Sequence, residues 1–227
     1  MQNEFVNVAA HELRTPAQAI LGYSEMLELG SNTEKTKLYE KAITRNAERL
    51  YSLTTDILDV ARIESQTLKL NKSYFDLNQE IEKVIKDIVE RPSWVEISNN
   101  VSLIFEPSVS TTIYGDRERI NQVIQNLVNN ALKFTDTGTI KISVEKNKCN
   151  EIIVTVTDTG TGIAKEIFPR LFNKFATKSK SGTGLGLYIS KAIIEAHGGS
   201  IEAYNNTEGN GATFRFTVPF NNASNES

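Results

Sequence analysis

The first third of the chain carries apolar residues at the 3.6-residue spacing of two long helices. One stripe runs through residues 2–29 and comprises Phe5, Val8, Ala9, Leu13, Ile20, Tyr23 and Leu27. The other runs through residues 34–65 and comprises Leu38, Ala42, Ile43, Leu50, Leu53, Ile57, Leu58, Val60, Ala61 and Ile63. Residues 30–33 interrupt the pattern and offer an N-cap for the second helix. We therefore predict an antiparallel pair of helices joined by a short loop.

A hairpin of two helices has too little interior to bury both of these apolar stripes. Pairing with a second copy, as a four-helix bundle, would bury them. The alternative is a monomeric hairpin that packs on the rest of the chain. We expect the first arrangement, a homodimer held by the helical domain.

Beyond residue 72 the pattern changes to short apolar runs and shorter helical stretches. Strands are predicted at residues 74–77, 101–105, 111–114, 139–147, 151–158, 200–205 and 212–219. Helices are predicted at residues 78–91, 115–134 and 184–197, with a short helical piece at 167–172. We therefore expect an α+β protein: a helical domain at 1–72, a two-layer α/β sandwich at 73–220 and a disordered tail at 221–227.

Composition narrows the classes of partner and compartment. The 227 residues have a formal net charge of −3 and no basic block, so we expect no nucleic-acid partner. Cys149 is the only cysteine, which excludes an intramolecular disulfide and fits a reducing compartment. No apolar run is long enough to cross a membrane, and no signal peptide is evident. We expect a cytoplasmic fragment, attached to a membrane only through segments that precede it.

His11 is the first candidate for chemistry, because an imidazole titrates near neutral pH and can act as a nucleophile. The adjacent Glu12 can orient the ring or accept its proton. Thr15 lies one turn further on, on nearly the same helix face, and Pro16 should bend the helix beside it. Taken alone, His11 also fits an ordinary surface position on a helix.

Three clusters in the second domain are typical of nucleotide chemistry. Asn126 and Asn130 lie one helical turn apart, so their amide oxygens can face Mg²⁺, and Lys133 near the same face can meet a phosphate. A solvated asparagine-rich face is the alternative. Asp158 ends a strand and is followed by Gly160 and Gly162, so its carboxylate can accept a hydrogen bond from the amine of adenine. A plain turn is the alternative there.

The third cluster opens the last helix, with Gly182, Thr183, Gly184, Leu185 and Gly186 in succession. Glycines let backbone amides approach phosphate oxygens, and a helix N-terminus favours anions. The spacing is not that of a Rossmann fingerprint, nor that of a Walker phosphate loop.

Together, these motifs resemble those of sensor histidine kinases over residues 2–220. His11 to Pro16 resembles the phosphoacceptor H box, and the three clusters resemble the N, DxGxG and GxGxG boxes of the histidine-kinase ATPase domain. Phe168, Phe172 and Phe175 resemble the F box, and residues 209–214 resemble the last glycine motif. The resemblance implies a dimeric four-helix bundle followed by an α/β sandwich of the gyrase, Hsp90, histidine kinase and MutL type.

The resemblance also implies roles for these residues. His11 would be phosphorylated, Glu12 would act as acid or base, and Thr15 would serve phosphatase activity. Asn126 and Asn130 would bind Mg²⁺, Lys133 would contact phosphate, and Asp158 would read adenine. The remaining nucleotide-binding residues would be Gly160, Gly162, Gly182, Thr183, Gly184, Leu185 and Gly186. Asn173 and Thr177 depart from the common pattern of Glu and Arg, so Lys178 becomes the candidate lid cation. His197 ends the last helix, and we expect it to be a structural cap.

The function implied is ATP-dependent autophosphorylation of His11 with Mg²⁺ as cofactor. The phosphoryl group would then pass to an aspartate in the receiver domain of a response regulator, which would dock near residues 19–27. Regulator phosphatase activity would accompany this. Two alternatives stay open: a dimeric scaffold that binds nucleotide without phosphotransfer, and a conformational ATPase of the Hsp90 or MutL kind.

Overall fold

The computed structural model of the chain describes residues 2–30, 33–90, 94, 100–108, 111–177 and 183–220, and the side chains from residue 5 onward. The chain divides into two compact units, Met1–Leu68 and Lys69–Ser227. Each unit is described by itself.

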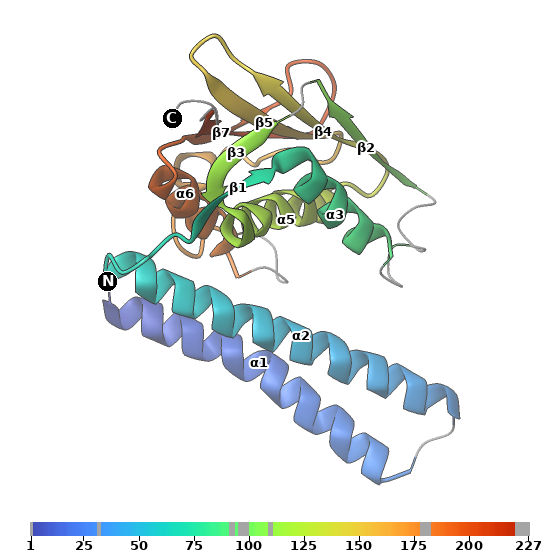
Figure 1. Cartoon of the computed structure of the whole chain (residues 1–227). Coiled ribbons are helices and arrows are strands. Elements are labelled where there is room, and N and C mark those ends of the chain that lie inside the picture. Colours follow the sequence, from blue (N-terminus) through green and yellow to red (C-terminus); the bar gives the residue numbers. More distant parts are fainter. Residues whose placement is uncertain are drawn as a thin grey trace. The chain divides into compact units, whose positions relative to one another are not determined.

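The first unit is an antiparallel pair of helices, α1 (Gln2–Glu28) and α2 (Thr33–Glu64), which lie side by side (Figure 1). Two contacts fix their register. The rings of Tyr23 and Tyr39 are 5.7 Å apart, and Arg49 Nη2 lies 3.2 Å from Glu12 Oε2. Ala9, Ala42 and Leu53 are buried. The predicted helical hairpin is therefore confirmed.

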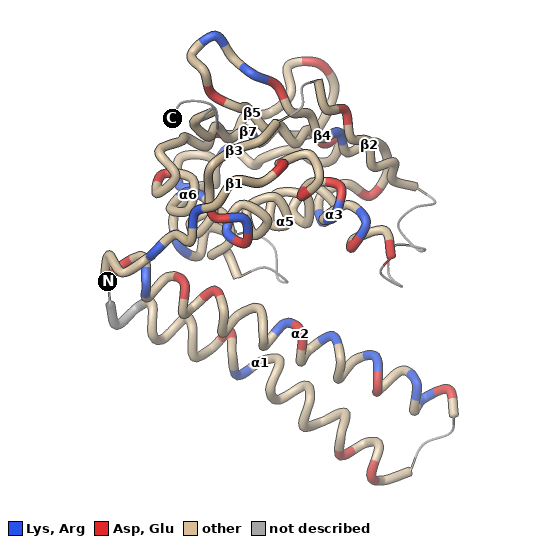
Figure 2. Tube along the Cα trace, in the orientation of Figure 1, with Lys and Arg blue, Asp and Glu red and all other residues tan. Residues whose placement is uncertain are grey.

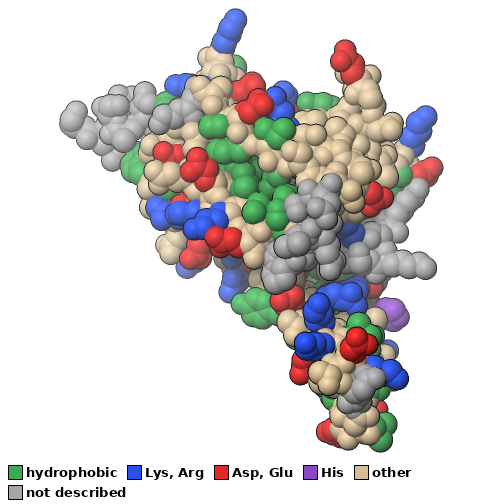
Figure 3. Space-filling view, turned by 90° about the vertical axis from the view of Figure 1, so that its right-hand side faces the viewer, with side chains coloured by type: hydrophobic (Ala, Val, Ile, Leu, Met, Phe, Trp, Pro, Cys, Tyr) green, Lys and Arg blue, Asp and Glu red, His purple; other side chains and the backbone are tan. Residues whose placement is uncertain are grey.

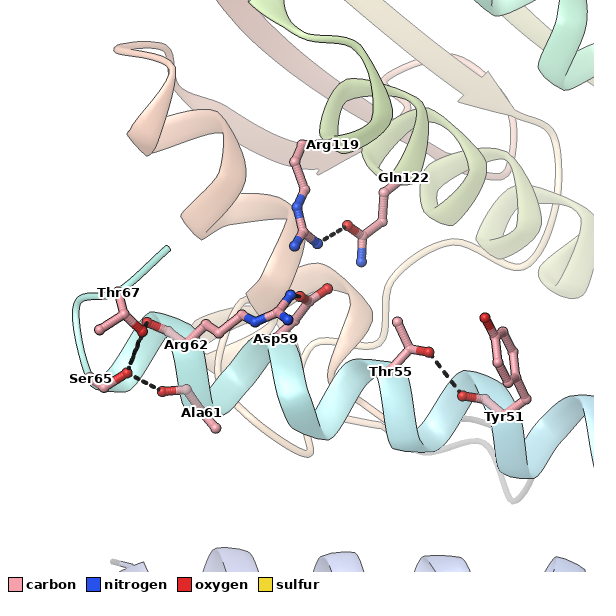
Figure 4. Close-up of polar contacts among 9 residues, drawn as sticks. All are labelled: Tyr51, Thr55, Asp59, Ala61, Arg62, Ser65, Thr67, Arg119 and Gln122. Carbon is pink, nitrogen blue, oxygen red and sulfur yellow. Dashed lines mark hydrogen bonds and ion pairs between the residues drawn. The ribbon is translucent and has the colours of Figure 1, made fainter. Parts of the chain in front are cut away.

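Local hydrogen bonds end α2 without a glycine. The Ser65 hydroxyl donates to the carbonyl of Ala61 at 2.7 Å and lies 2.8 Å from the hydroxyl of Thr67 (Figure 4). Gln66 follows with φ +55°, in the left-handed region that typically closes a helix. At the other helix, α1 continues through Pro16, which is buried within it.

The hairpin leaves large apolar side chains at its surface. These are Val6, Leu21, Met26, Leu29, Leu38, Tyr51 and Leu58, each at least 49% exposed. Charged residues recur along α2 and are sparser on α1 (Figure 2). Among the described residues, none of the helices is long and apolar enough to cross a membrane.

The second unit contains a five-stranded mixed sheet with helices on one face (Figure 1). The sheet order is β2-β4-β5-β7-β6, in which only β2 and β4 run parallel. Its strands are β2 (Val101–Pro107), β4 (Gly138–Lys146), β5 (Glu151–Asp158), β6 (Ile201–Asn205) and β7 (Ala212–Pro219). A separate antiparallel ribbon joins β1 (Lys72–Asp76) and β3 (Thr112–Asp116). The helices are α3 (Leu77–Val89), α5 (Arg117–Phe134), η1 (Phe168–Arg170) and α6 (Gly186–Ala196).

Alternation along the strands builds the core between sheet and helices. In β5, Ile152, Val154 and Val156 are buried, whereas the residues between them are half-exposed. The helices supply fully buried apolar side chains to the same layer: Ile120, Ile124, Leu127, Ile189, Ile193 and Ile194. The expected two-layer sandwich is present. Figure 3 shows hydrophobic side chains also gathered on one outer face of this unit, among charged ones.

Aspartates begin both α3 and α5. Asp76 accepts hydrogen bonds from the amides of Asn78 and Gln79, and Asp116 accepts one from Arg119. Asp116 also accepts from the Asn71 amide at 2.7 Å, so residues 69–72 group with the second unit. Within α5, Arg119 donates to the side chain of Gln122 (Figure 4).

His197 is the C-cap of α6 and is buried. Its Nε2 accepts a hydrogen bond of 2.9 Å from the amide of Asp116, which requires a neutral ring with the proton on Nδ1. Nδ1 lies 2.8 Å from the carbonyl of Ile193 and donates to it. Burial lowers the pKa of His197, and Lys72 lowers it further, against the opposing effects of Ile193 and Asp116. The structural role expected for His197 is confirmed.

Candidate functional site

The imidazole of His11 is accessible on α1. Its side chain is 74% exposed, and its Nδ1 lies 4.0 Å from Glu12 Oε1. The other carboxylate oxygen of Glu12 is held by Arg49, at 3.2 Å. Glu12 is therefore fixed between the ring and a cation of α2, and the carboxylate lies on the Nδ1 side of the imidazole. Nε2 is then the nitrogen that Glu12 leaves free for reaction.

Thr15 lies one turn beyond His11, as the sequence predicts. Its hydroxyl donates to the backbone carbonyl of His11 at 3.3 Å, and the residue is exposed. Pro16 has no amide to offer the preceding turn, so this side-chain bond supports the backbone next to the proline. The hydroxyl oxygen keeps lone pairs that can accept a hydrogen bond from water.

The first cluster of the second unit sits against α6. Asn126 and Asn130 are half-buried on α5, and Asn130 Nδ2 lies 3.5 Å from Asn126 Oδ1. The amide of Asn126 donates to the hydroxyl of Ser190, which is buried on α6, at 2.9 Å. A Cβ at Gly186 would lie only 2.2 Å from Asn126 Oδ1. The N-box and GxGxG-box residues are thus in direct contact.

Lys133 is exposed in the last turn of α5, with its ammonium 5.5 Å from the centre of the Phe134 ring. Since Asn126, Asn130 and Lys133 follow one another at turn spacing, they line the same side of α5. Within the described residues, no group of three or more His, Cys, Asp or Glu side chains is placed to hold a metal ion. Asn126 and Asn130 offer amide oxygens, a kind of ligand that a hard cation such as Mg²⁺ accepts.

Asp158 ends β5 with a buried carboxylate. Its Oδ1 accepts hydrogen bonds from the amides of Gly160 (2.9 Å) and Ala212 (3.2 Å). Burial raises the pKa of Asp158, and these two amides lower it. Both bonds end on Oδ1, which leaves Oδ2 as the oxygen able to accept from a ligand amine.

Close backbone contacts hold the loop that follows Asp158. A Cβ at Gly160 would lie 2.1 Å from the carbonyl oxygen of Phe134, and a Cβ at Gly211 would lie 2.0 Å from that of Asp158. Gly162 has φ +73°, a conformation that other residues rarely adopt. The loop therefore needs glycine for space at some positions and for torsion at others.

The helix α6 begins without a capping side chain on its N-cap residue. Its N-cap residue, Leu185, makes no side-chain capping bond, in contrast to Asp76 and Asp116 at α3 and α5. The first amides of a helix have no intrahelical partner, and they carry the positive end of its dipole. Ahead of it, the Thr183 hydroxyl accepts from the Leu185 amide at 3.1 Å, and Gly184 (φ +66°) packs on the backbone of Phe175. This arrangement can bind phosphate.

Two predicted site residues, Lys178 and Gly182, lie outside the described residues. The F-box stretch contains the single 3₁₀ turn η1, and Phe175 at its end has φ +60°. Among the described residues, Arg49, Ser190, Asn205 and Asn206 also contact the site, and the sequence did not single them out. Each contacts a motif residue far away in the chain.

Two family models match the chain. Residues 1–66 match the His Kinase A (phospho-acceptor) domain, and residues 115–222 match the histidine kinase-, DNA gyrase B- and HSP90-like ATPase. The sensor protein SrrB of Staphylococcus aureus is 34% identical over 228 residues, which cover 96% of this chain and 38% of SrrB. The chain thus spans about two fifths of the length of that relative.

Solved structures agree with the family models. The histidine kinase AdeS of Acinetobacter baumannii has a TM-score of 0.74 at 32% identity, over 93% of this chain and 98% of AdeS. The histidine kinase ThkA, solved in complex with the response regulator protein TrrA, has a TM-score of 0.72 at 31% identity, over 96% of this chain and 61% of that chain. With a phospho-acceptor domain, a following ATPase domain and a match to nearly the whole of AdeS, the chain belongs to the sensor histidine kinases and comprises their catalytic core.

Proposed function

We propose that the chain is an ATP-dependent protein-histidine kinase that phosphorylates His11. The observation that carries this proposal is that one chain contains both a candidate phosphoryl acceptor and a candidate nucleotide site. One unit offers an exposed imidazole beside a fixed carboxylate, and the other offers Asp158 and the uncapped N-terminus of α6. An exposed nucleophile without a nucleotide site, or the reverse, would not support phosphotransfer.

In this proposal, the second unit binds ATP by its base and its phosphates. Asp158 Oδ2 accepts a hydrogen bond from the exocyclic amine of adenine. The phosphates are bound by the amides at the start of α6, around Gly184 and Gly186, with the hydroxyl and amide of the 183–185 turn nearby. Lys133 supplies a point charge to the phosphates. From the sequence motifs, we predict that Lys178 and Gly182 also bind the nucleotide.

Asn126 and Asn130 fit a Mg²⁺ ion. Both offer neutral amide oxygens, both lie half-buried on one side of α5, and Gly186 brings the phosphate-binding backbone against Asn126. Mg²⁺ prefers such hard oxygen ligands, with phosphate and water completing its shell. When bound, the ion neutralises charge on the phosphates. Ser190 holds the Asn126 amide so that its oxygen, not its nitrogen, faces Asn130 and Gly186.

At the histidine, Nε2 attacks the γ-phosphorus of ATP. The N–P bond forms as the bond to the bridging β–γ oxygen breaks, and ADP leaves. Positive charge that develops on the ring is stabilised at Nδ1 by Glu12, and Arg49 keeps that carboxylate in place. Positioning and charge neutralisation supply most of the catalysis in such transfers. The phosphoryl group then passes from Nε2 to an aspartate carboxylate of a response regulator, and His11 is regenerated.

The proposal includes two partners. A second copy covers the apolar residues that the hairpin leaves exposed, among them Leu21, Leu38 and Leu58, because patches of this kind mark interfaces. The response regulator docks near residues 19–27 of α1 and the start of α2. ThkA, a similar protein, has been solved in complex with such a regulator. Thr15, with its exposed hydroxyl next to His11, orients water when the regulator is dephosphorylated.

Incubation with γ-labelled ATP and Mg²⁺ tests the activity. The parent chain should become labelled, and the label should be lost in acid, because phosphohistidine is acid-labile and phosphoserine is not. His11→Gln should bind ADP within a few-fold of the parent and remain unlabelled. Labelling of His11→Gln would refute the acceptor assignment. ADP binding without any labelling of the parent would instead identify a nucleotide-binding scaffold.

A further inference from the structure

Two adjacent asparagines at the end of β6 hold the Asp158 loop at both of its ends. Asn205 Oδ1 accepts a hydrogen bond from the amide of Ile163 at 2.6 Å, and its Nδ2 donates to the carbonyl of the same residue at 3.0 Å. Asn206 Nδ2 donates to the carbonyl of Asp158 at 2.8 Å. The segment from Asp158 to Ile163 is therefore fixed by the last residue of β6, Asn205, and by the residue that follows it, Asn206.

Asn206 is itself held from several sides. Its Nδ2 also donates to the Asn210 carbonyl at 3.1 Å, and its Oδ1 accepts from the hydroxyl of Thr213 at 2.8 Å. Its backbone amide donates to the Gly211 carbonyl at 3.1 Å. Thr213 is buried, and Asn206 is half-buried. The side chain therefore has one position, defined by donors and acceptors that are mutually consistent.

The carbonyl that Asn206 holds belongs to the residue whose carboxylate faces the nucleotide. Ala212, which donates to Asp158 Oδ1, follows Gly211, and a Cβ at Gly211 would lie 2.0 Å from the Asp158 carbonyl oxygen. Asn206, after the end of β6, thus fixes the backbone of Asp158, and Ala212, at the start of β7, helps to fix its side chain. Without Asn206, the Asp158 carbonyl loses a hydrogen-bond partner. The amides of Gly160 and Ala212 still hold Oδ1, but the backbone that carries the carboxylate is less firmly fixed, and so is the direction of Oδ2.

We propose that Asn206 and Asn205 are positioning residues for nucleotide recognition, and that Asn206 sets the preference for adenine over guanine. Adenine presents an amine at the position where guanine presents a carbonyl oxygen. A carboxylate oxygen held in one direction accepts from the amine and repels the carbonyl, and a site built for one hydrogen bond discriminates strongly. Asn205 has a different role, because its two hydrogen bonds to Ile163 hold the far end of the segment that begins at Asp158. This inference rests on the proposed ATP site.

The test compares Asn206→Ala and Asn205→Ala with a matched control, Asn147→Ala. Asn147 also ties a turn through its side chain, because its Oδ1 accepts from the amides of Cys149 and Glu151 at 2.9 Å each. It lies at the opposite end of β5 from Asp158. Affinities for ADP and for GDP are measured by calorimetry on the whole chain, together with the melting temperature.

Asn206→Ala should bind ADP about three- to tenfold more weakly, the change expected for loss of one positioned hydrogen bond, while GDP affinity changes less. The ADP-to-GDP preference therefore falls. Asn205→Ala should lower the affinity for both nucleotides by about the same modest factor, since its bonds are at the surface. Asn147→Ala should leave both affinities unchanged.

An ADP-to-GDP preference in Asn206→Ala equal to that of the parent would overturn the inference, and so would equal weakening of ADP and GDP accompanied by a lower melting temperature. If the alanine variant does not fold, the isosteric Asn206→Asp lacks the same donated hydrogen bonds and gives the same test. A parent chain that binds neither nucleotide would overturn the proposed function itself. By contrast, if the parent binds ADP and the variants have the same ADP-to-GDP preference as the parent, only this inference is overturned.

Discussion

Replacing Gly186 by alanine should separate the stability of the second unit from its use of Mg²⁺. Gly186 is the first residue of α6, and its φ is not positive, so alanine fits the backbone there. The new Cβ would lie 2.2 Å from Asn126 Oδ1, whereas real Cβ atoms keep at least 3.0 Å. The Asn126 side chain must therefore rotate away and lose its hydrogen bond to Ser190.

The two effects on stability nearly cancel. Alanine is favoured over glycine in a helix by up to about 1 kcal/mol, and less at a helix terminus. The lost Asn126–Ser190 bond costs about 1 kcal/mol. For a domain of this size, 1 kcal/mol shifts the melting temperature by about 2–4 °C, so we expect a change no larger than that. The displaced amide oxygen, by contrast, removes a proposed Mg²⁺ ligand, and autophosphorylation should fall by at least about tenfold.

Calorimetric titrations of ADP with and without Mg²⁺, a melting curve and a labelling assay provide the measurements. Gly22→Ala is the matched control, since Gly22 lies within helix α1 and has nothing within 4 Å of its added Cβ. Ser190→Ala is the companion, because it removes the same hydrogen bond without adding bulk near the phosphates, and it should give a smaller loss in the same direction. Parent-level labelling and Mg²⁺ dependence in Gly186→Ala would refute the role assigned to Asn126.

Three further predictions concern Asp158, His197 and Thr15. Because burial raises the pKa of Asp158, the charged carboxylate is disfavoured in the folded state, and Asp158→Asn should melt no lower than the parent at pH 7. The same variant should bind ADP at least about tenfold more weakly, as measured by calorimetry. Because burial lowers the pKa of His197, the unfolded chain binds the proton more readily than the folded chain. The free energy of unfolding, measured with urea, should therefore fall as pH drops below 6.5. In His197→Gln, this dependence of the unfolding free energy on pH should be lost. Thr15→Ala should keep most labelling and lose dephosphorylation of a phosphorylated regulator, assayed with ADP present; dephosphorylation at the parent rate would contradict it.

Periodicity predicted the elements well because burial follows it closely. In β5, the buried positions alternate without exception from Ile152 to Asp158, and in the first unit the two apolar stripes became α1 and α2. The starts of α3 and α5 follow from Asp76 and Asp116, whose capping bonds depend only on neighbouring residues. Local interactions of this kind are readable from a short window of sequence.

Contacts between distant residues could not be predicted in the same way. Arg49 lies 37 positions from Glu12, Asn206 lies 48 from Asp158, and Ser190 lies 64 from Asn126. Nothing in the local pattern distinguishes these polar residues from solvated ones. Only the strand order, which places β6 next to β7 and β7 next to β5, brings the asparagines at the end of β6 to the aspartate at the end of β5. Sequence motifs therefore found the groups expected to touch the nucleotide and missed those that hold them.

The glycines show how a motif can be found correctly for an incomplete reason. For the glycines that open α6, the sequence suggests the approach of backbone amides to phosphate. The structure adds torsional freedom as a reason at Gly162 and Gly184, which have φ of +73° and +66°. Gly160 and Gly186 have no such torsion, yet a Cβ at either would collide, with the Phe134 carbonyl in one case and with Asn126 in the other. A backbone carbonyl cannot move aside without shifting its helix end, whereas an asparagine side chain can rotate. The two glycines are thus required for different reasons. Gly160 allows the loop after Asp158 to pack against the end of α5, and Gly186 allows the Asn126 amide oxygen to keep its orientation.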